Sequence, residues 1–249
     1  MPSCSTSENP RGVIITFIEE THKYFSTING QEITYTSGTQ FLGKYFPKFD
    51  PTGEITARCA KKAGCTVEEI KARWDAKGKE SCRLGTRLHE TIEDVLLKND
   101  FRNTPENDEE QQRFNNGIKM GQKLLQTVDI LGVEKIVFSD RLRIAGTIDL
   151  FAKSRKDDTY LIIDHKTNKE IEQENKYKKY CLGPISHIDD TNYMHYALQL
   201  NLYQYLLKYE QYVPKNAKFR LFLNHVTSED AKLIELPDLQ LEIRDLVIE

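Results

Sequence analysis

The sequence predicts an α/β protein with a central mixed β-sheet flanked by helices, preceded by an N-terminal β-hairpin and a helical extension. Two observations lead to this prediction. Apolar, β-rich runs joined by short turns occur near the N-terminus and again in the middle of the chain. Longer segments with helical periodicity lie between and after them. With 249 residues, the chain can bury a substantial core.

The N-terminal region is predicted to contain a short tail, one strand and a hairpin. Residues 1–12 are polar and are expected to form a flexible tail. Residues 13–18 read as a strand. The hairpin turns at Asn29-Gly30, because this pair supplies the positive φ angles of a tight turn. Ser37 is expected to cap a short helix that runs to Tyr45, before Pro47.

The next region is predicted to be helical. Residues 55–98 are expected to form three helices, with breaks at Gly64 and Gly78. Thr66 and Glu69 fit a capping box at the start of the second helix. The remaining elements are expected in the order helix 108–127, strand 133–138, hairpin 146–167, polar insertion 168–191, helix 193–209 and strand 217–226.

The hairpin at residues 146–167 carries the most informative polar residues. Asp149 and Asp164 each interrupt an apolar run, and Lys166 follows Asp164 at a spacing that places both on one face of a strand. Two acids and a lysine are costly to bury together unless something binds there. A divalent metal ion explains them, and an oxygen-rich ligand set suits Mg²⁺ or Mn²⁺. A buried ion pair with a spare acid is the alternative.

Composition excludes several classes of protein. No signal peptide or bilayer-spanning run is visible, so we expect no membrane association and a cytoplasmic location. Five cysteines without a Cys-x-x-Cys pair indicate reduced thiols. The formal charge of −3 argues weakly against DNA binding, since a cleft can be basic within an acidic whole.

Several motifs, in order along the chain, resemble those of the PD-(D/E)XK nuclease superfamily, and specifically its RecB-like exonuclease branch. The N-terminal hairpin and residues 35–49 look similar to phage-type members of that branch. The matching motifs are Gly85-Thr86-x-x-His89, Gly146-x-x-Asp149, Asp164-x-Lys166-Thr167 and Gln199-x-x-x-Tyr203. Glu134 lies where these proteins often place an acid on a preceding strand. The resemblance implies the PD-(D/E)XK, or restriction-endonuclease-like, core.

By this resemblance, the metal ligands would be His89, Asp149, Asp164 and the main-chain carbonyl of His165, with Glu134 as a further candidate. Lys166 would be catalytic together with the two aspartates. One or two Mg²⁺ or Mn²⁺ ions are expected. Some relatives hold an iron–sulfur cluster through four cysteines, and Cys181 is the sole cysteine in the C-terminal region, so no iron–sulfur cluster is expected.

A second group of residues is predicted to bind DNA or to brace the site: Arg141, Arg143, Thr167, Lys176, Tyr177, Lys178, Lys179, Gln199 and Tyr203. The lysine–tyrosine run alternates cations with rings, a pattern suited to single-stranded DNA, although a solvated loop would also explain it. Gln199 and Tyr203, one helical turn apart, could equally be interface residues of an amphipathic helix.

The domain organisation expected from these elements is a tail at 1–12, a hairpin and helical region at 13–84 packed on the core, and a nuclease core at 85–249. The predicted function is metal-dependent exonucleolytic hydrolysis of DNA from single-stranded or frayed ends. It would serve DNA replication, recombination or degradation, with a recombination or replication protein as a candidate partner. A structure-selective endonuclease with the same residues and a non-catalytic DNA-binding subunit are the alternatives.

Overall fold

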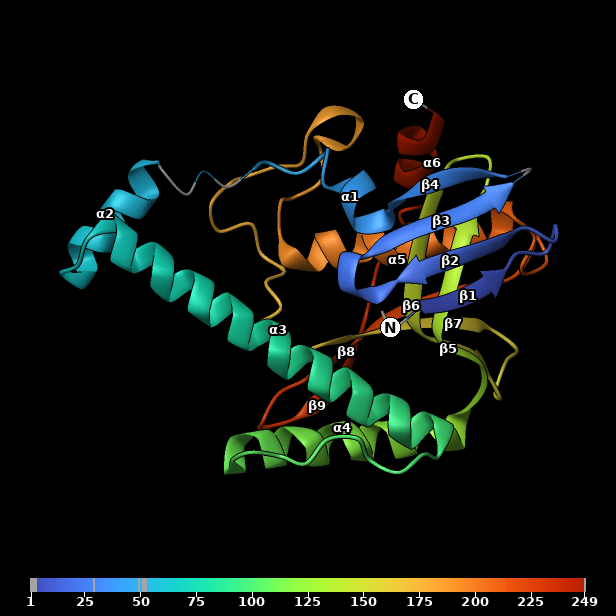
Figure 1. Cartoon of the computed structure of the whole chain (residues 1–249), viewed down its shortest axis with the longest axis horizontal. Helices are drawn as coiled ribbons and strands as arrows, with labels where there is room; N and C mark the ends of the chain where they lie inside the picture. Colours follow the sequence, from blue (N-terminus) through green and yellow to red (C-terminus); the bar gives the residue numbers. More distant parts are fainter. Residues whose placement is uncertain (1–3, 29, 49, 51–52, 249) are drawn as a thin grey trace.

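In this computed structural model, which describes residues 4–28, 30–48, 50 and 53–248, strand β6 (Ile144–Ser154) pairs with three neighbouring strands of a nine-stranded mixed sheet (Figure 1). Strand β5 (Val128–Ser139) pairs antiparallel with β6 along one edge. On the other edge, β4 (Gln31–Ser37) pairs in parallel with the start of β6, and β7 (Tyr160–Lys166) pairs antiparallel with its later part. Residues between these two pairings, including Asp149, therefore lie where two neighbouring strands separate.

The other strands extend the sheet on both sides. On the β4 side the order is β1 (Cys4–Glu8), β2 (Ile14–Ile18), β3 (Lys23–Ile28) and β4, all antiparallel. On the β7 side, β8 (Phe219–Val226) runs parallel to β7 and β9 (Ala231–Glu235) antiparallel to β8. The predicted mixed α/β sheet flanked by helices is confirmed.

The N-terminus differs from the prediction. Residues Cys4–Glu8 form strand β1, paired with β2 from Cys4↔Ile18 to Glu8↔Ile14, so a loose tail is wrong for this part. The sequence of this segment lacks the alternation of apolar and polar residues that identifies a strand. It forms a strand because its backbone hydrogen-bonds to N–H and C=O groups that β2 would otherwise leave unpaired at its edge. The predicted hairpin is confirmed as β3 and β4; Asn29 of its turn and residues 1–3 lie outside the described residues.

The first helices also differ in part. Helix α1 (Gly38–Leu42) is capped by the Ser37 side chain, which accepts from the Gln40 N–H, but it ends three residues before Tyr45. Helix α2 (Glu54–Ala63) ends at Gly64, as predicted, and Thr66 begins α3 (Val67–Leu97) with the predicted capping box. The predicted break at Gly78 is wrong, because α3 is continuous through it. A helical glycine costs only about 1 kcal/mol relative to alanine, and strong helix formers flank this one.

The first half of α3 and helix α2 project from the rest of the molecule as an arm (Figure 1). Within α3, Ile70 is buried in this arm, whereas the later buried positions, from Leu88 to Leu96, face the sheet and α4 (Asp108–Thr127). The predicted domain boundary between residues 84 and 85 therefore falls inside one helix.

Helices cover both faces of the sheet. Helices α3 and α4 pack on one face, where Leu88 and Phe114 meet Leu150 and Ile163. Helix α5 (Asn192–Tyr209) packs on the other face, together with α6 (Gln240–Ile248), which the sequence analysis missed. Short 3-10 turns lie at Glu19–Thr21 and at Gly183–Ile185. Among the helices that the structure describes, none is long and apolar enough to cross a membrane.

The strands β1 to β4 form a small sheet that folds over β5. Ile15, Tyr24 and Tyr35 pack against Ile136 and Phe138 in a separate apolar cluster. This packing, rather than the short β4–β6 pairing alone, fixes the N-terminal sheet beside the strands that carry the candidate site residues.

Candidate active site

Three carboxylates lie in one row across adjacent strands. In the β5–β6 register, Glu134 falls opposite Asp149, between the pairs Val133↔Leu150 and Lys135↔Ile148. In the β6–β7 register, Asp164 falls opposite Asp149, one step beyond Leu150↔Ile163. Like charges opposite one another destabilise a sheet. A cation bound among them would remove this cost.

His89 reaches this row from helix α3. Its Nδ1 lies 3.4 Å from Asp149 Oδ2, and its Nε2 lies 2.8 Å from the His165 carbonyl oxygen. The same Asp149 oxygen accepts a hydrogen bond from the His165 backbone N–H at 2.7 Å. Because β6 and β7 separate here, this N–H is available to Asp149. The structure thus brings His89, Asp149 and the His165 carbonyl together.

The donor set fits a hard divalent cation. One ligand atom each from His89, Glu134 and Asp149 lie within 4.8 Å of one another. Carboxylate, carbonyl and imidazole ligands suit Mg²⁺ or Mn²⁺ better than a closed zinc site.

Glu134 is held toward this centre by an unusual backbone. Its φ is 47°, a left-handed conformation that costs a non-glycine residue about 1 kcal/mol or more. Although the residue is exposed at the mouth of a cavity, the surrounding protein atoms restrict its solvation. Together with the negative charge of Asp149, this raises the pKa of Glu134 to about 8. A bound cation would favour the ionised form.

Asp164, the third carboxylate of the row, is buried and pairs with the half-buried Lys166. Lys166 Nζ lies 2.5 Å from Asp164 Oδ2 and forms an ion pair with it. Burial raises the pKa of Asp164, and Lys166 offsets this only in part. Burial alone would lower the pKa of Lys166, but Asp164 and Asp149 outweigh it and the net shift is upward. Lys166 therefore stays positively charged next to the carboxylates.

Two contacts that the sequence analysis missed position these groups. The Lys166 ammonium lies over the Tyr196 ring, 4.8 Å from its centroid, a cation–π contact. Asn224 Nδ2 donates to His165 Nδ1 at 3.0 Å, and burial lowers the pKa of His165 to about 3, so that ring is neutral. Tyr196 lies three residues before Gln199 on α5, a spacing that could have identified it. Nothing in the sequence pairs Asn224 with His165.

Gln199 and Tyr203 lie behind the strand that carries Asp149. Gln199 Nε2 donates to the Tyr203 hydroxyl at 3.0 Å, and Tyr203 is only 4 % exposed, packed against Gly146. Burial raises the pKa of Tyr203 above its usual range, so the hydroxyl is protonated. In this arrangement Tyr203 supports β6 and does not reach the molecular surface.

Gly146→Ala is expected to destabilise the protein by about 1–3 kcal/mol or more. A Cβ at this position would lie 2.3 Å from Tyr203 Cε1, a distance that real contacts do not reach. Thermal or urea unfolding would measure the loss. Tyr203→Leu, which removes the clashing ring edge, should recover part of it in the double variant. If Gly146→Ala alone unfolds like the wild type, this packing is not as close as described.

The other predicted DNA-binding residues lie elsewhere. Thr167 follows β7, and its carbonyl oxygen accepts a hydrogen bond from Arg113 Nη1. Its hydroxyl lies beside Gly85 of α3, 3.5 Å from the position that a Cβ would take there. Arg141 and Arg143 lie in the turn between β5 and β6, and Arg143 pairs with Asp140. The run Lys176, Tyr177, Lys178 and Lys179 is exposed in the loop between β7 and α5.

A comparison with protein families agrees with this geometry. Residues 119–246, about half of the chain, match the family model of the PD-(D/E)XK nuclease superfamily. A search of curated proteins found no match. The chain belongs to the PD-(D/E)XK nuclease superfamily. Membership supports nuclease activity with a divalent metal and implies DNA as substrate. The match includes Asp149, Asp164 and Lys166 but begins after His89, whose place in the site is given by its contacts.

Proposed function

We propose that this protein is a metal-dependent deoxyribonuclease that hydrolyses phosphodiester bonds at the ends of single-stranded or frayed DNA. The observation that carries the proposal is the convergence of His89, Asp149 and Glu134 within 4.8 Å, next to the Asp164–Lys166 ion pair. Acidic ligands to hold a cation and a fixed lysine to meet a phosphate are what phosphodiester hydrolysis needs.

The residues divide this work between them. His89, Asp149, Glu134 and the His165 carbonyl would hold one divalent ion, and Asp164, which borders the same space, is a further candidate ligand. When bound, such an ion polarises a phosphoryl oxygen and offsets the negative charge of the phosphate. Lys166, fixed by Asp164 and the Tyr196 ring, is placed to neutralise charge that develops on the phosphoryl oxygens. Asn224 and Tyr203 position β7 and β6.

The finer parts of the proposal rest on the motifs. The order Gly85-Thr86-x-x-His89, Asp149, Asp164-x-Lys166 and Gln199-x-x-x-Tyr203 supports the RecB-like exonuclease branch. The sequence of the N-terminal hairpin and of residues 35–49 supports a phage-type origin. The five free cysteines support a cytoplasmic location, that of a bacterial host if the protein is phage-encoded. A protein of DNA replication or recombination is the partner we propose.

A digestion panel tests this function. End-labelled linear single-stranded DNA, linear duplex, circular single-stranded DNA and RNA are incubated with Mg²⁺ or Mn²⁺, and with a chelator. We expect linear single-stranded DNA to be degraded with either metal, the circle to stay intact, and the chelator to stop all cleavage. Cleavage of the circle would indicate an endonuclease instead. Cleavage that continues with chelator would contradict metal dependence.

A further inference from the structure

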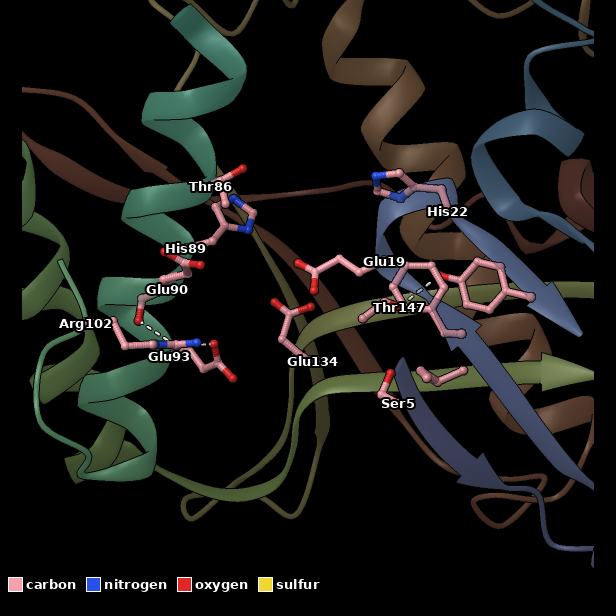
Figure 2. A pocket seen from close by; sticks show the side chains of 13 residues that line it. Ser5, Glu19, His22, Thr86, His89, Glu90, Glu93, Arg102, Glu134 and Thr147 are labelled. Atoms are coloured by element: carbon pink, nitrogen blue, oxygen red, sulfur yellow. Dashed lines mark hydrogen bonds and ion pairs between the residues drawn. The ribbon is translucent and has the colours of Figure 1, made fainter. Parts of the chain in front are cut away.

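A cavity of about 440 Å³ opens beside the candidate metal centre (Figure 2). One side is formed by the N-terminal sheet and the other by helix α3. His89 and Glu134 belong both to its lining and to the cluster of candidate metal ligands. Its volume lies in the range of small-ligand sites. A group that enters this cavity would therefore lie next to the reaction centre.

The N-terminal side of the cavity is aromatic. Phe17 and Tyr24 are paired across β2 and β3, and their rings stack with centroids 4.5 Å apart. The exposed His22 ring meets Phe17 edge-on at 5.8 Å. Tyr24 is buried and its hydroxyl is hydrogen-bonded to Thr147 Oγ1 at 2.9 Å, two residues before Asp149. The aromatic wall is therefore fixed relative to the metal ligands.

The opposite side of the cavity is acidic. Glu90 and Glu93 come from α3, while Glu19 and Glu134 point into the space between the helix and the N-terminal sheet (Figure 2). The arginine that lines the cavity, Arg102, is already paired with Glu93 and with Asp94. A phosphate would be repelled from this space. A flat, uncharged group with N–H donors would be accepted, since it can stack on the rings and donate to the carboxylates.

We propose that this cavity is a nucleobase pocket, which holds the base of the nucleotide next to the scissile phosphate, stacked on Phe17 and flanked by His22. The inference rests on the proposed function and specifies its substrate further. A base can enter the pocket only when it is unpaired, so the pocket selects single-stranded DNA. The carboxylates accept hydrogen bonds from the amino groups of adenine, cytosine and guanine. Thymine, which lacks an amino group, is the disfavoured base.

Phe17→Ala tests the stacking surface. We expect KM for a short single-stranded oligonucleotide to rise by about 5- to 100-fold, the usual loss for one base–aromatic stack. Phe17→Trp, which keeps a flat ring, should retain most of the affinity. Phe25→Ala is the matched control, because Phe25 lies beside Tyr24 on β3 with its side chain on the other face. Thermal unfolding of each variant shows whether it is folded.

The substrate is varied in the same experiment. Oligonucleotides carry an abasic residue, a thymine or a cytosine at each position near the cleaved bond. For wild-type protein, we expect an abasic residue at one position to raise KM, and cytosine to be preferred to thymine there. In Phe17→Ala the abasic residue should have little further effect. Equal KM for all these substrates and variants would overturn the nucleobase pocket while leaving metal-dependent cleavage, and so the proposed function, intact.

A binding measurement keeps the two proposals separate. If wild-type protein shows no metal-dependent cleavage, the proposed function fails, and an oligonucleotide containing the fluorescent base 2-aminopurine still tests the pocket. Stacking quenches its fluorescence. Quenching by the wild type and by Phe25→Ala, but not by Phe17→Ala, would support the pocket. Identical fluorescence with all three proteins would contradict it.

Discussion

Asp164→Asn is expected to lower the rate of DNA cleavage by about 100-fold or more. The asparagine amide is neutral and holds a divalent cation poorly. It also removes the charge that faces the half-buried Lys166 ammonium at 2.5 Å. Single-turnover digestion of labelled single-stranded DNA in Mg²⁺ measures the rate, and calorimetric titration with Mn²⁺ measures the affinity for metal.

Asp129→Asn is the matched control for this substitution. Asp129 is an exposed acid on β5 that pairs with Arg155 at the surface, so cleavage should be unchanged. Thermal unfolding of both variants distinguishes lost chemistry from lost structure. A folded Asp164→Asn protein that cleaves DNA at the wild-type rate would show that the site has been assigned wrongly.

Lys166→Met separates the role of the lysine from that of the acids. The carboxylates and His89 remain, so Mn²⁺ binding should persist, whereas cleavage should again fall by about 100-fold. Loss of metal binding in this variant as well would mean that Lys166 organises the ligands instead of meeting the phosphate.

Arg87→Met should be the substitution that most affects stability, with an expected loss of about 3–5 kcal/mol. Arg87, on α3 two residues before His89, donates to the buried Glu110 of α4 at 2.7 Å and to the Thr104 carbonyl at 2.6 Å. Its removal leaves the carboxylate of Glu110, whose side chain is 1 % exposed, without its cation. Urea unfolding measures the loss, and His89 should lose its fixed position.

Arg83→Met is the control, because Arg83 pairs with the exposed Glu80 and Glu106, where solvent screens the charges, and its loss should change stability little. In the double variant Arg87→Met/Glu110→Leu, an apolar pair replaces the ions and should recover much of the stability. If Arg83→Met and Arg87→Met lowered the free energy of unfolding equally, the burial of Glu110 would not be the cause of the loss.

The same ion pair predicts a dependence on pH. Burial raises the pKa of Glu110, but Arg87 and the Glu106 backbone N–H more than offset this, and the net shift is downward from 4.5. A carboxylate whose pKa is lower in the folded protein stabilises the fold at pH values above its pKa in the unfolded chain. This contribution is lost as the pH falls through the pKa of the group in the folded protein. The unfolding temperature of the wild type should therefore fall relative to that of the double variant below about pH 4.5.

The sequence was informative wherever local chemistry decides the structure. Three predicted features depend on neighbours in the chain: the capping box at Thr66, the turn signal before Gly30 and the helix at residues 108–127. The described residues of each feature have the expected structure. Asp149, Asp164 and Lys166 were identified because they interrupt apolar strands. Their roles remain predictions, although the family assignment supports a site of this kind.

Features that depend on distant segments could not be predicted in this way. Cys4–Glu8 becomes a strand because β2 offers an open edge, and Gly78 stays helical because its neighbours propagate the helix. The position of the aromatic wall around Phe17 could not be predicted, because it depends on the N-terminal sheet folding over β5. The roles of Tyr196 and Asn224 likewise follow from the side chains that they contact, Lys166 and His165.

The projecting arm has a consequence for how the chain can be divided. Residues 4–42 are held to the remainder by the Tyr35–Phe138 contact, by the hydrogen bond from the Tyr35 hydroxyl to Asp140 and by the β4–β6 pairing. None of these ties passes through the arm. A cut near Gly78 would thus leave two polypeptides that still share one sheet, and the enzyme could be assembled from separately made halves, with the aromatic wall on one half and Asp149, Asp164 and Lys166 on the other.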